Sequence, residues 1–258
     1  MGAARSRDAS PQMERARAAE VFARLRLSLR DEGLFIVLPL VADAFDAVCL
    51  PSAGPSAAEL LPHIGTLMLV GDGGPTFFQR FQASRVVTAE GDNPLDDYTR
   101  SRIASVVERV LHPEGIPYAI RHPFGDEGGR PLPFQRLGCA AGLAAPGPLG
   151  LQIHPVYGPW WAYRALVATT LPHDEAVEEF APFCPRCEQP CVTGCAVHPS
   201  VARGTATTPV GEATCGDGCG ARGRCPVGVE HRYSMAQVAF HARAREVMTA
   251  AWAATRPR

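Results

Sequence analysis

The sequence predicts an α+β protein with a cysteine-rich lobe near its C-terminal end. Segments with helical periodicity alternate with short apolar runs typical of buried strands, but without the strand–helix–strand rhythm of a dinucleotide-binding fold. Seven of the nine cysteines fall between Cys184 and Cys225, in a stretch rich in glycine and proline. A chain of 258 residues is long enough to bury a substantial core without help from those cysteines.

The N-terminal part is predicted to begin with a helix over residues 11–31. A Ser-Pro pair typical of helix starts opens this segment, apolar residues recur in it at helical spacing, and a glycine follows it. The apolar runs at 34–41 and 66–70 predict two buried strands. The second strand is expected to end in the turn GDGGP, before an amphipathic segment that starts at Pro75.

The rest of the chain is predicted to contain a second long helix over 93–111, with Asn93 as its cap. Residues 119–148 are rich in glycine and proline, and a short helix is expected there at 134–145. The remaining expected elements are two strands over 149–155 and 160–171, a loop-rich stretch over 199–230, and a last helix over 234–253. We therefore expect a core (1–180), a cysteine-rich lobe (181–230) and a C-terminal helix that packs on the core (231–258).

Composition narrows the function classes. A formal net charge of -1 gives no long-range attraction to nucleic acid or to anionic lipid, so neither is expected as a partner. The most apolar run, LFIVLPLV, is too short to cross a bilayer, and the first residues contain no apolar signal-peptide centre. We expect a cytoplasmic protein, and in a reducing compartment clustered cysteines indicate a metal or cofactor site rather than disulfides.

The clustered cysteines form two sets. They are Cys184, Cys187, Cys191 and Cys195, followed by Cys215, Cys219 and Cys225. Short spacings allow successive thiolates to meet at one centre, and a Cys-Pro pair closing a set is typical of bacterial ferredoxins. Structural zinc is the simpler alternative, because any four thiolates complete a tetrahedral site. We favour an iron–sulfur centre of the 4Fe–4S type, as in ferredoxins, in which His198 or His231 could supply a missing ligand.

Residues 150–172, GLQIHPVYGPWWAYRALVATTLP, are the other candidate site. A His-Pro pair after a strand is usually part of a turn, and paired tryptophans are usually core residues. Aromatic residues beside glycines can also enclose a flat cofactor, because glycine lets the backbone approach a ring closely.

This segment resembles the signature of the CblC family of cobalamin-processing proteins, IHP-x-[FY]-G-x-W-[FW]-A-x-R. Three further segments resemble that family in the same order, namely GTLMLVGDGGPTFFQRF, DNPLDDYTRSRIASVVERV and HRYSMAQVAFHARAR. The resemblance covers most of residues 34–245. It implies a modified flavin nitroreductase-like core that binds cobalamin with its nucleotide tail displaced from cobalt and removes the upper ligand, by dealkylation with glutathione or by reductive decyanation.

The resemblance also implies roles for individual residues. Trp160 and Trp161 would shape the cofactor pocket, and Arg164 matches an arginine that holds the thiol cosubstrate. The residues expected to contact cobalamin or its tail are Gly142, Gly150, Leu151, Gln152, Ile153, His154, Pro155 and Gly158. The family's second glutathione-binding arginine has no match in this sequence. Arg243 and Arg245 lie near the expected place without matching it.

Cys139 departs from the family pattern, because vertebrate members have a histidine at this place. A small buried hydrophobic role is the simple interpretation of a lone cysteine. In the functional interpretation, the small neighbouring residues let a flat cofactor ring or the backbone approach Cys139 closely. A Cys139 thiolate, its pKa lowered by Arg136, would then ligate cobalt or accept the alkyl group.

The cysteine-rich lobe resembles epoxyqueuosine reductases, cobalamin enzymes with two 4Fe–4S clusters, a feature shared with reductive dehalogenases. Cys184, Cys187 and Cys191 match three of four ligands of one cluster, while Ala181 and Val192 stand where that pattern has a cysteine and a proline. The cysteine pattern of the lobe is therefore an incomplete form of the ferredoxin pattern.

Three functions follow as hypotheses. The leading one is an oxidoreductase that binds cobalamin and removes its upper ligand, with electrons from the lobe, from glutathione or another thiol, or from a reductase that acts as electron donor. The second is a cobalamin-dependent reductase of an organic substrate, with Tyr157, Tyr163 or His154 as proton donor. The third is a cobalamin carrier with a zinc-stabilised lobe.

Overall fold

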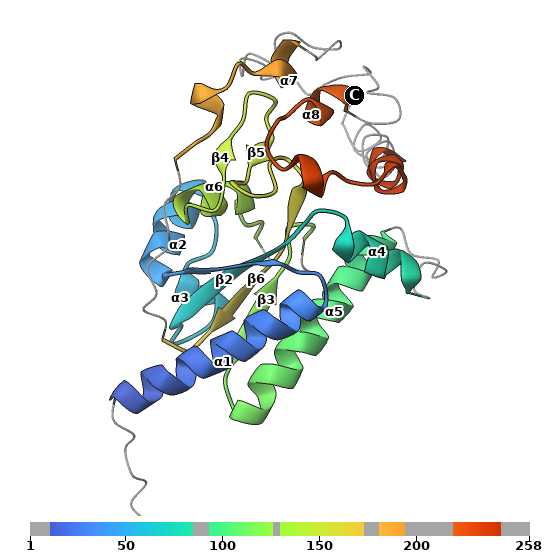
Figure 1. The fold of residues 1–258 in the computed structure, drawn as a ribbon. Coiled ribbons are helices and arrows are strands. Elements are labelled where there is room, and N and C mark those ends of the chain that lie inside the picture. The colour runs from blue at the N-terminus through green and yellow to red at the C-terminus, as the bar shows by residue number, and fades with distance from the viewer. Residues whose placement is uncertain (1–10, 85–92, 126–129, 173–180, 194–218, 244–258) are drawn as a thin grey trace, which may run out of the picture.

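A computed structural model describes residues 11–84, 93–125, 130–172, 181–193 and 219–243. Its centre is an antiparallel sheet in which two long strands lie between two short ones (Figure 1). The strand order is β1-β2-β6-β3, with bounds Ile36–Leu40, Thr66–Gly73, Trp161–Thr169 and Tyr118–Arg121. The protein is therefore α+β, as the sequence predicts.

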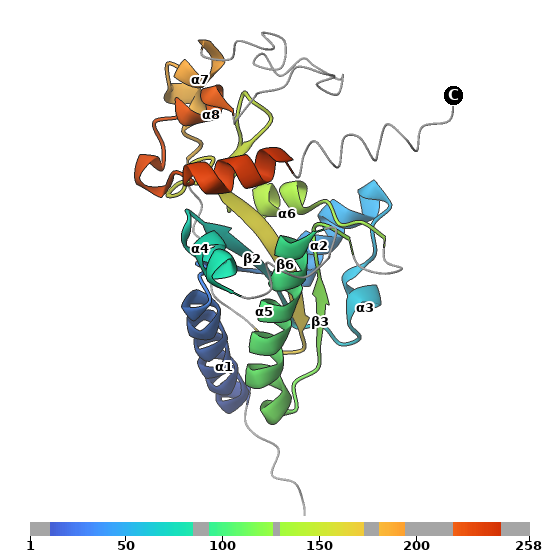
Figure 2. The same ribbon diagram turned by 90° about the vertical axis from the view of Figure 1, so that its right-hand side faces the viewer.

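Both faces of the sheet are covered by helices (Figures 1 and 2). Alternate residues of a strand point to opposite faces, so β2 contributes Met68 and Val70 to one core and Leu67 and Leu69 to the other. The first core is covered by α1 (Pro11–Asp31), α4 (Thr76–Ala83) and α5 (Pro94–Leu111). The second is covered by α2 (Ala42–Cys49), α3 (Ala57–Leu60) and α6 (Phe134–Ala140).

The remaining elements gather beyond one end of the sheet (Figure 1). A two-stranded ribbon, β4 (Ala145–Pro146) with β5 (Gln152–Ile153), lies beside the short helices α7 (Pro190–Thr193) and α8 (Gly220–Gly223). Short 3-10 turns complete the described part, namely η1 (Leu50–Ser52), η3 (His112–Glu114), η4 (Cys184–Arg186) and η5 (Val229–His231).

The last described helix, 235–243, is the visible part of the helix expected over 234–253, whose remainder lies outside the described residues. Phe240 packs its ring 5.2 Å from that of Phe78 and 5.6 Å from that of Phe81, both in α4. This contact attaches the C-terminal segment to the first core.

Several expected boundaries were wrong. The strand β2 continues to Gly73 instead of ending before the GDGGP turn, because these residues pair with the start of β6 after a bulge. The expected strand 149–155 is reduced to the two residues of β5, and the expected helix 134–145 ends at Ala140. The helices α2 and α3 and the strand β3 were not predicted from the sequence.

No described helix has the length and apolar character needed to cross a membrane.

Candidate functional site

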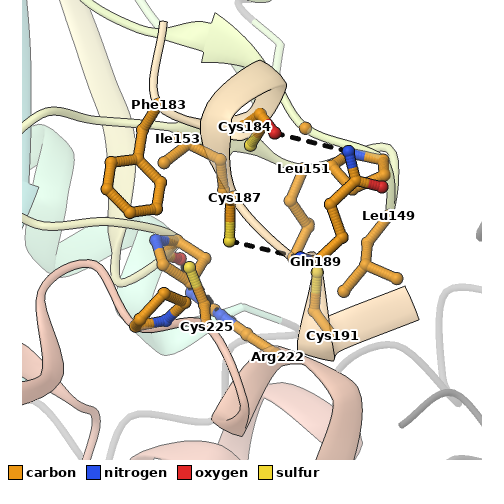
Figure 3. A pocket seen from close by; sticks show the side chains of 14 residues that line it. Leu149, Leu151, Ile153, Phe183, Cys184, Cys187, Gln189, Cys191, Arg222 and Cys225 are labelled. Carbon is orange, nitrogen blue, oxygen red and sulfur yellow. Dashed lines mark hydrogen bonds between the residues drawn. The ribbon is translucent and has the colours of Figure 1, made fainter. Parts of the chain in front are cut away.

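Four thiols line one small cavity, here called the thiol cavity (Figure 3). Cys184 lies in η4, Cys187 follows it, Cys191 lies in α7, and Cys225 comes from the segment after α8. The other walls are mostly apolar and include Leu149, Leu151 and Ile153 from the β4–β5 ribbon. The fold thus brings three cysteines of the first set together with the last cysteine of the second.

Local hydrogen bonds shape the loop that carries these cysteines. The Gln189 backbone N–H donates to the Cys187 sulfur at 3.3 Å, and the Gln189 side-chain amide donates to the Cys184 carbonyl at 3.3 Å. Gln189 itself has a left-handed backbone, with φ of 54°. Such a turn lets the chain reverse within the CPRCEQPC segment, so that its three thiols face the same cavity.

Burial favours the neutral form of three of these thiols. Burial raises the pKa of Cys184, Cys191 and Cys225, and the charge of neighbouring thiolates raises each pKa further. Only a thiolate is a good metal ligand, so a metal that binds here must displace protons.

The spacing of the thiols bears on the kind of centre they suit. Within the described ranges, no three His, Cys, Asp or Glu side chains gather closely enough to hold a single metal ion. In an iron–sulfur cluster each thiolate binds a different iron atom, so the thiols lie around the cluster rather than around one atom. The four thiols line one cavity without converging on a single atom.

A larger opening, here called the cleft, has a volume of about 700 Å³. Its walls come from α6, β5, the start of β6, α8 and the 233–241 segment, and they include Phe134, Trp161, Tyr163 and Tyr233. This volume is within the range of small-molecule and cofactor sites.

One side of the cleft carries a hydrogen-bonded network centred on Gln152. Tyr163 donates its hydroxyl to Gln152 Oε1 at 2.5 Å, and Gln152 Nε2 donates to the Gln135 carbonyl at 2.6 Å and to the Cys139 sulfur at 2.8 Å. The Trp161 indole N–H donates to the Gln152 carbonyl at 3.1 Å. These bonds use both hydrogens and the oxygen of the Gln152 amide, which fixes its orientation.

The structure contradicts the expected activation of Cys139. Burial raises the pKa of this thiol, the Gln152 hydrogen bond lowers it less, and the Arg136 guanidinium binds the Ser52 hydroxyl instead at 2.6 Å. The small residues around Cys139 also serve a protein contact. A Cβ atom on Gly138 would lie 1.7 Å from the Tyr163 hydroxyl, so the glycine allows Tyr163 to approach α6.

Three residues line both openings, namely Leu151, Pro159 and Arg222. They form a shared wall, so the thiol cavity and the cleft are adjacent. Of these three residues, Arg222 connects separate segments of the chain. Its Nε donates to the Pro159 carbonyl at 3.0 Å, and its Nη2 donates to the same oxygen. Its guanidinium carbon lies 4.6 Å from the ring centres of Trp160 and Tyr233. It joins α8 to the start of β6.

The IHPVYG turn packs against residues 227–231. Gly158 has φ of 57°, and a Cβ atom there would lie 2.0 Å from the Val227 carbonyl oxygen. His154 Nδ1 accepts the backbone N–H groups of Val156 and Tyr157 at 3.0 and 3.2 Å, so its proton is on Nε2. Burial is the main cause that lowers the pKa of His154 to about 4, and His231 adds to it.

The predicted cofactor-binding residues divide into four groups by place. Gln152 and Trp161 line the cleft, Ile153 lines the thiol cavity, and Leu151 lines both. The others lie outside the linings of these two openings, namely Gly142, Gly150, His154, Pro155, Gly158 and Trp160. Contact of any of these residues with cobalamin stays a prediction.

Arg164 is nearly inaccessible, with 5% exposure, and its Nε donates to Asp72 Oδ1 at 2.6 Å. Asp72 is fully buried, and its ion pair with Arg164 joins β2 to β6. A buried pair of this kind stabilises the two charges mutually. Binding of a thiol cosubstrate by Arg164 stays a prediction.

The remaining predicted metal ligands do not all reach the thiol cavity. Cys195, Cys215 and His198 lie outside the described residues. Cys219 caps α8, where its sulfur accepts the Arg222 backbone N–H at 3.4 Å, and it does not line the thiol cavity. His231 lies against Tyr157, with ring centres 4.7 Å apart, and is also absent from the cavity lining.

Sequence analysis missed Arg222 and Phe134 as lining residues. Nothing in the segment GARGRC distinguishes Arg222 from its neighbours, because its position depends on a contact with Pro159, 63 residues away. Tyr233 and His241, which also line the cleft, belong to the HRYSMAQVAFHARAR segment that resembles the CblC family.

Comparisons with known proteins support the fold. No protein-family model matches the chain, and no curated protein matches it by sequence. A C. elegans B12-trafficking protein CblC, a homologue of human MMACHC, matches with a TM-score of 0.59 and 17% identity over 88% of this chain and 92% of that chain.

Epoxyqueuosine reductase structures also match. A selenomethionine-labelled one has a TM-score of 0.56 and 14% identity, and one with an epoxyqueuosine-modified tRNA-Tyr stem loop has 0.56 and 12%. Each match covers 84% of this chain and 68% of that chain. The chain has the fold that CblC and epoxyqueuosine reductase share. At these identities the likeness shows the fold alone.

Proposed function

We propose that the protein binds cobalamin in the cleft and removes its upper ligand reductively, with electrons from an iron–sulfur centre held in the thiol cavity. The observation that carries this proposal is the shared wall, which places a four-thiol cavity directly beside an aromatic cleft of cofactor size. The fold shared with a B12-trafficking protein supports it.

The thiol cavity supplies the ligand set. Cys184, Cys187, Cys191 and Cys225 would hold the centre as thiolates. For Cys184, Cys191 and Cys225 this requires loss of the protons that burial favours. A bound iron–sulfur cluster supplies single electrons. The apolar side chains of Leu149 and Ile153 line this cavity.

The cleft supplies the substrate site. Trp161, Tyr163 and Phe134 offer flat apolar surfaces to a corrin ring. In decyanation, one electron reduces cobalt(III) to cobalt(II), and cyanide departs with the bonding pair. The Gln152 network orients the polar groups on this side, including the neutral Cys139 thiol.

The test is purification without oxygen followed by two measurements. We expect iron and acid-labile sulfide in the protein, and conversion of cyanocobalamin to cob(II)alamin with release of cyanide when a reductant is present. Stoichiometric zinc without sulfide would favour a cobalamin carrier, and absence of any spectral change with excess cobalamin would refute cobalamin binding.

A second candidate is a cobalamin-dependent reductase that acts on an organic substrate. The fold shared with epoxyqueuosine reductase, together with the four-thiol cavity, supports it. Among the proposed proton donors, Tyr163 lines the cleft, whereas Tyr157 and His154 do not. Turnover of cyanocobalamin without an organic substrate would favour the first candidate over the second.

A further inference from the structure

Among the described residues that line the cleft, the charged side chains are those of Arg136 and Arg222, and none is an aspartate or a glutamate. The chain as a whole has a net charge of only -1, so the positive character is a local property of the cleft. A wall of this kind favours an occupant that carries negative charge.

Arg222 is the more firmly positioned of the two arginines. Two of its nitrogens donate to the Pro159 carbonyl, and its guanidinium lies against the rings of Trp160 and Tyr233, 4.6 Å from each centre. Within the described part of the chain, no carboxylate forms an ion pair with it. Among the described residues, therefore, the Arg222 side chain is held in place without an acidic partner.

Such an arginine is prepared to bind an anion. Its position is fixed before a ligand arrives, so little rotamer freedom is lost on binding. The adjacent aromatic surfaces indicate a ligand with an extended flat face, and the guanidinium indicates an acidic group attached to it. Arginine is especially suited to phosphate, whose oxygens match its planar set of donors.

We propose that Arg222 recognises an anionic group of the molecule that occupies the cleft. On the function proposed above, from which this inference takes the ligand, that group is the phosphodiester of the cobalamin nucleotide tail. Most other side chains of cobalamin are neutral amides, so the phosphodiester is the part that a guanidinium distinguishes.

The test compares cobalamin with cobinamide, which has the corrin ring but lacks the nucleotide tail and its phosphodiester. Arg222→Gln removes the charge and keeps a polar side chain. We expect this substitution to weaken cobalamin binding by about tenfold or more, the effect of losing one charge-assisted hydrogen bond. Binding of cobinamide should change less than about twofold. Comparison of the two ligands therefore separates the loss of anion recognition from a loss of the cleft's structure.

Two further variants serve as controls. Arg222→Lys keeps the charge but not the planar donors, and should weaken cobalamin binding less than Arg222→Gln while leaving cobinamide unaffected. Arg224→Gln removes the same charge from an exposed position on the same segment that lines neither opening, and should leave both affinities unchanged. Circular dichroism and thermal unfolding establish that each variant is folded.

The possible outcomes are distinct. If Arg222→Gln weakens the binding of both ligands equally, Arg222 only supports the structure, and if cobalamin binding is unchanged, Arg222 has no role in it. Either result overturns this inference and leaves the proposed function in place. If the parent protein binds neither ligand, the proposed function is refuted and this inference is refuted with it.

Discussion

His154 shows how a buried residue responds to pH. Its Nδ1 accepts two backbone N–H groups, so the neutral ring stabilises the turn that follows it, and protonation at this nitrogen would remove both bonds. Because the pKa falls from 6.5 to about 4 on folding, the unfolded chain binds more protons between these values. Stability is therefore full above pH 6.5 and decreases as the pH falls toward 4.

We predict that this decrease reaches about 2 kcal/mol by pH 5. His154→Asn keeps an acceptor near the Nδ1 position but does not titrate, so its free energy of unfolding should depend less on pH by that amount. Urea unfolding of both proteins at pH 7.5, 6 and 5 measures the difference. Equal pH dependence in the two proteins would contradict the assignment.

Cys139 tests whether a thiol in the cleft has a chemical role. Because burial raises its pKa, we expect a neutral thiol that accepts the Gln152 hydrogen bond. Cys139→Ser keeps an acceptor and should keep cobalamin affinity and decyanation within about threefold. Cys139→Ala leaves a Gln152 donor unpaired, and should weaken binding by several-fold, as expected for about 1 kcal/mol.

The two substitutions at Cys139 discriminate between the interpretations. Loss of turnover in both variants with cobalamin binding retained would assign the thiol to the chemistry, against the positional role. Unchanged behaviour in both would leave it as a small buried residue.

At the scale of elements, the two cysteine segments should contribute unequally to the metal centre. Cys187 lies beside η4 and lines the thiol cavity, whereas Cys219 caps α8 and does not. We predict that the Cys187→Ser and Cys225→Ser proteins, purified without oxygen, each bind less iron and sulfide than the parent protein, by the same fraction. The Cys219→Ser protein should keep the iron and sulfide content of the parent. A decrease as large as that of Cys187→Ser would contradict the geometry.

Much of the fold could be predicted because the long elements carry strong periodic signals. The helix α1 has the predicted bounds, and α5 begins at Pro94 with Asn93 at its N-cap position, as predicted. The strand β3 was missed because it has only four residues, all partly exposed, and lies at the sheet edge in a segment that local composition marks as irregular. The end of β2 was misplaced because pairing with β6 overrides the turn signal of its glycines.

The candidate site was predictable only in part. Cysteine spacing predicts that Cys184, Cys187 and Cys191 converge, since they are close in sequence and share one turn. The Cys-Pro pair marks Cys225 as a predicted ligand, but its meeting with the first set depends on tertiary contacts. The placement of Arg222 depends on tertiary contacts that no local pattern encodes. The raised pKa of Cys139 likewise follows from burial, so the sequence alone led to the wrong expectation that Arg136 would lower it.

At the scale of the whole molecule, the arrangement unites two parts that the sequence separates. Residues near 150 line both openings, and Arg222 contacts the beginning of β6 across the shared wall. We therefore predict that a centre held by these thiols would lie close enough to the cleft to reduce its occupant without a diffusing thiol.

The most direct test is a single-turnover reaction without oxygen. Protein with its iron–sulfur centre reduced, and freed of excess reductant, is mixed with cyanocobalamin while visible absorbance is recorded. We predict that the absorbance of the oxidised centre returns as cob(II)alamin appears, with one electron lost per cobalt reduced, and that Cys187→Ser shows neither change. Cobalamin that binds to the reduced protein while the centre stays reduced would contradict the account.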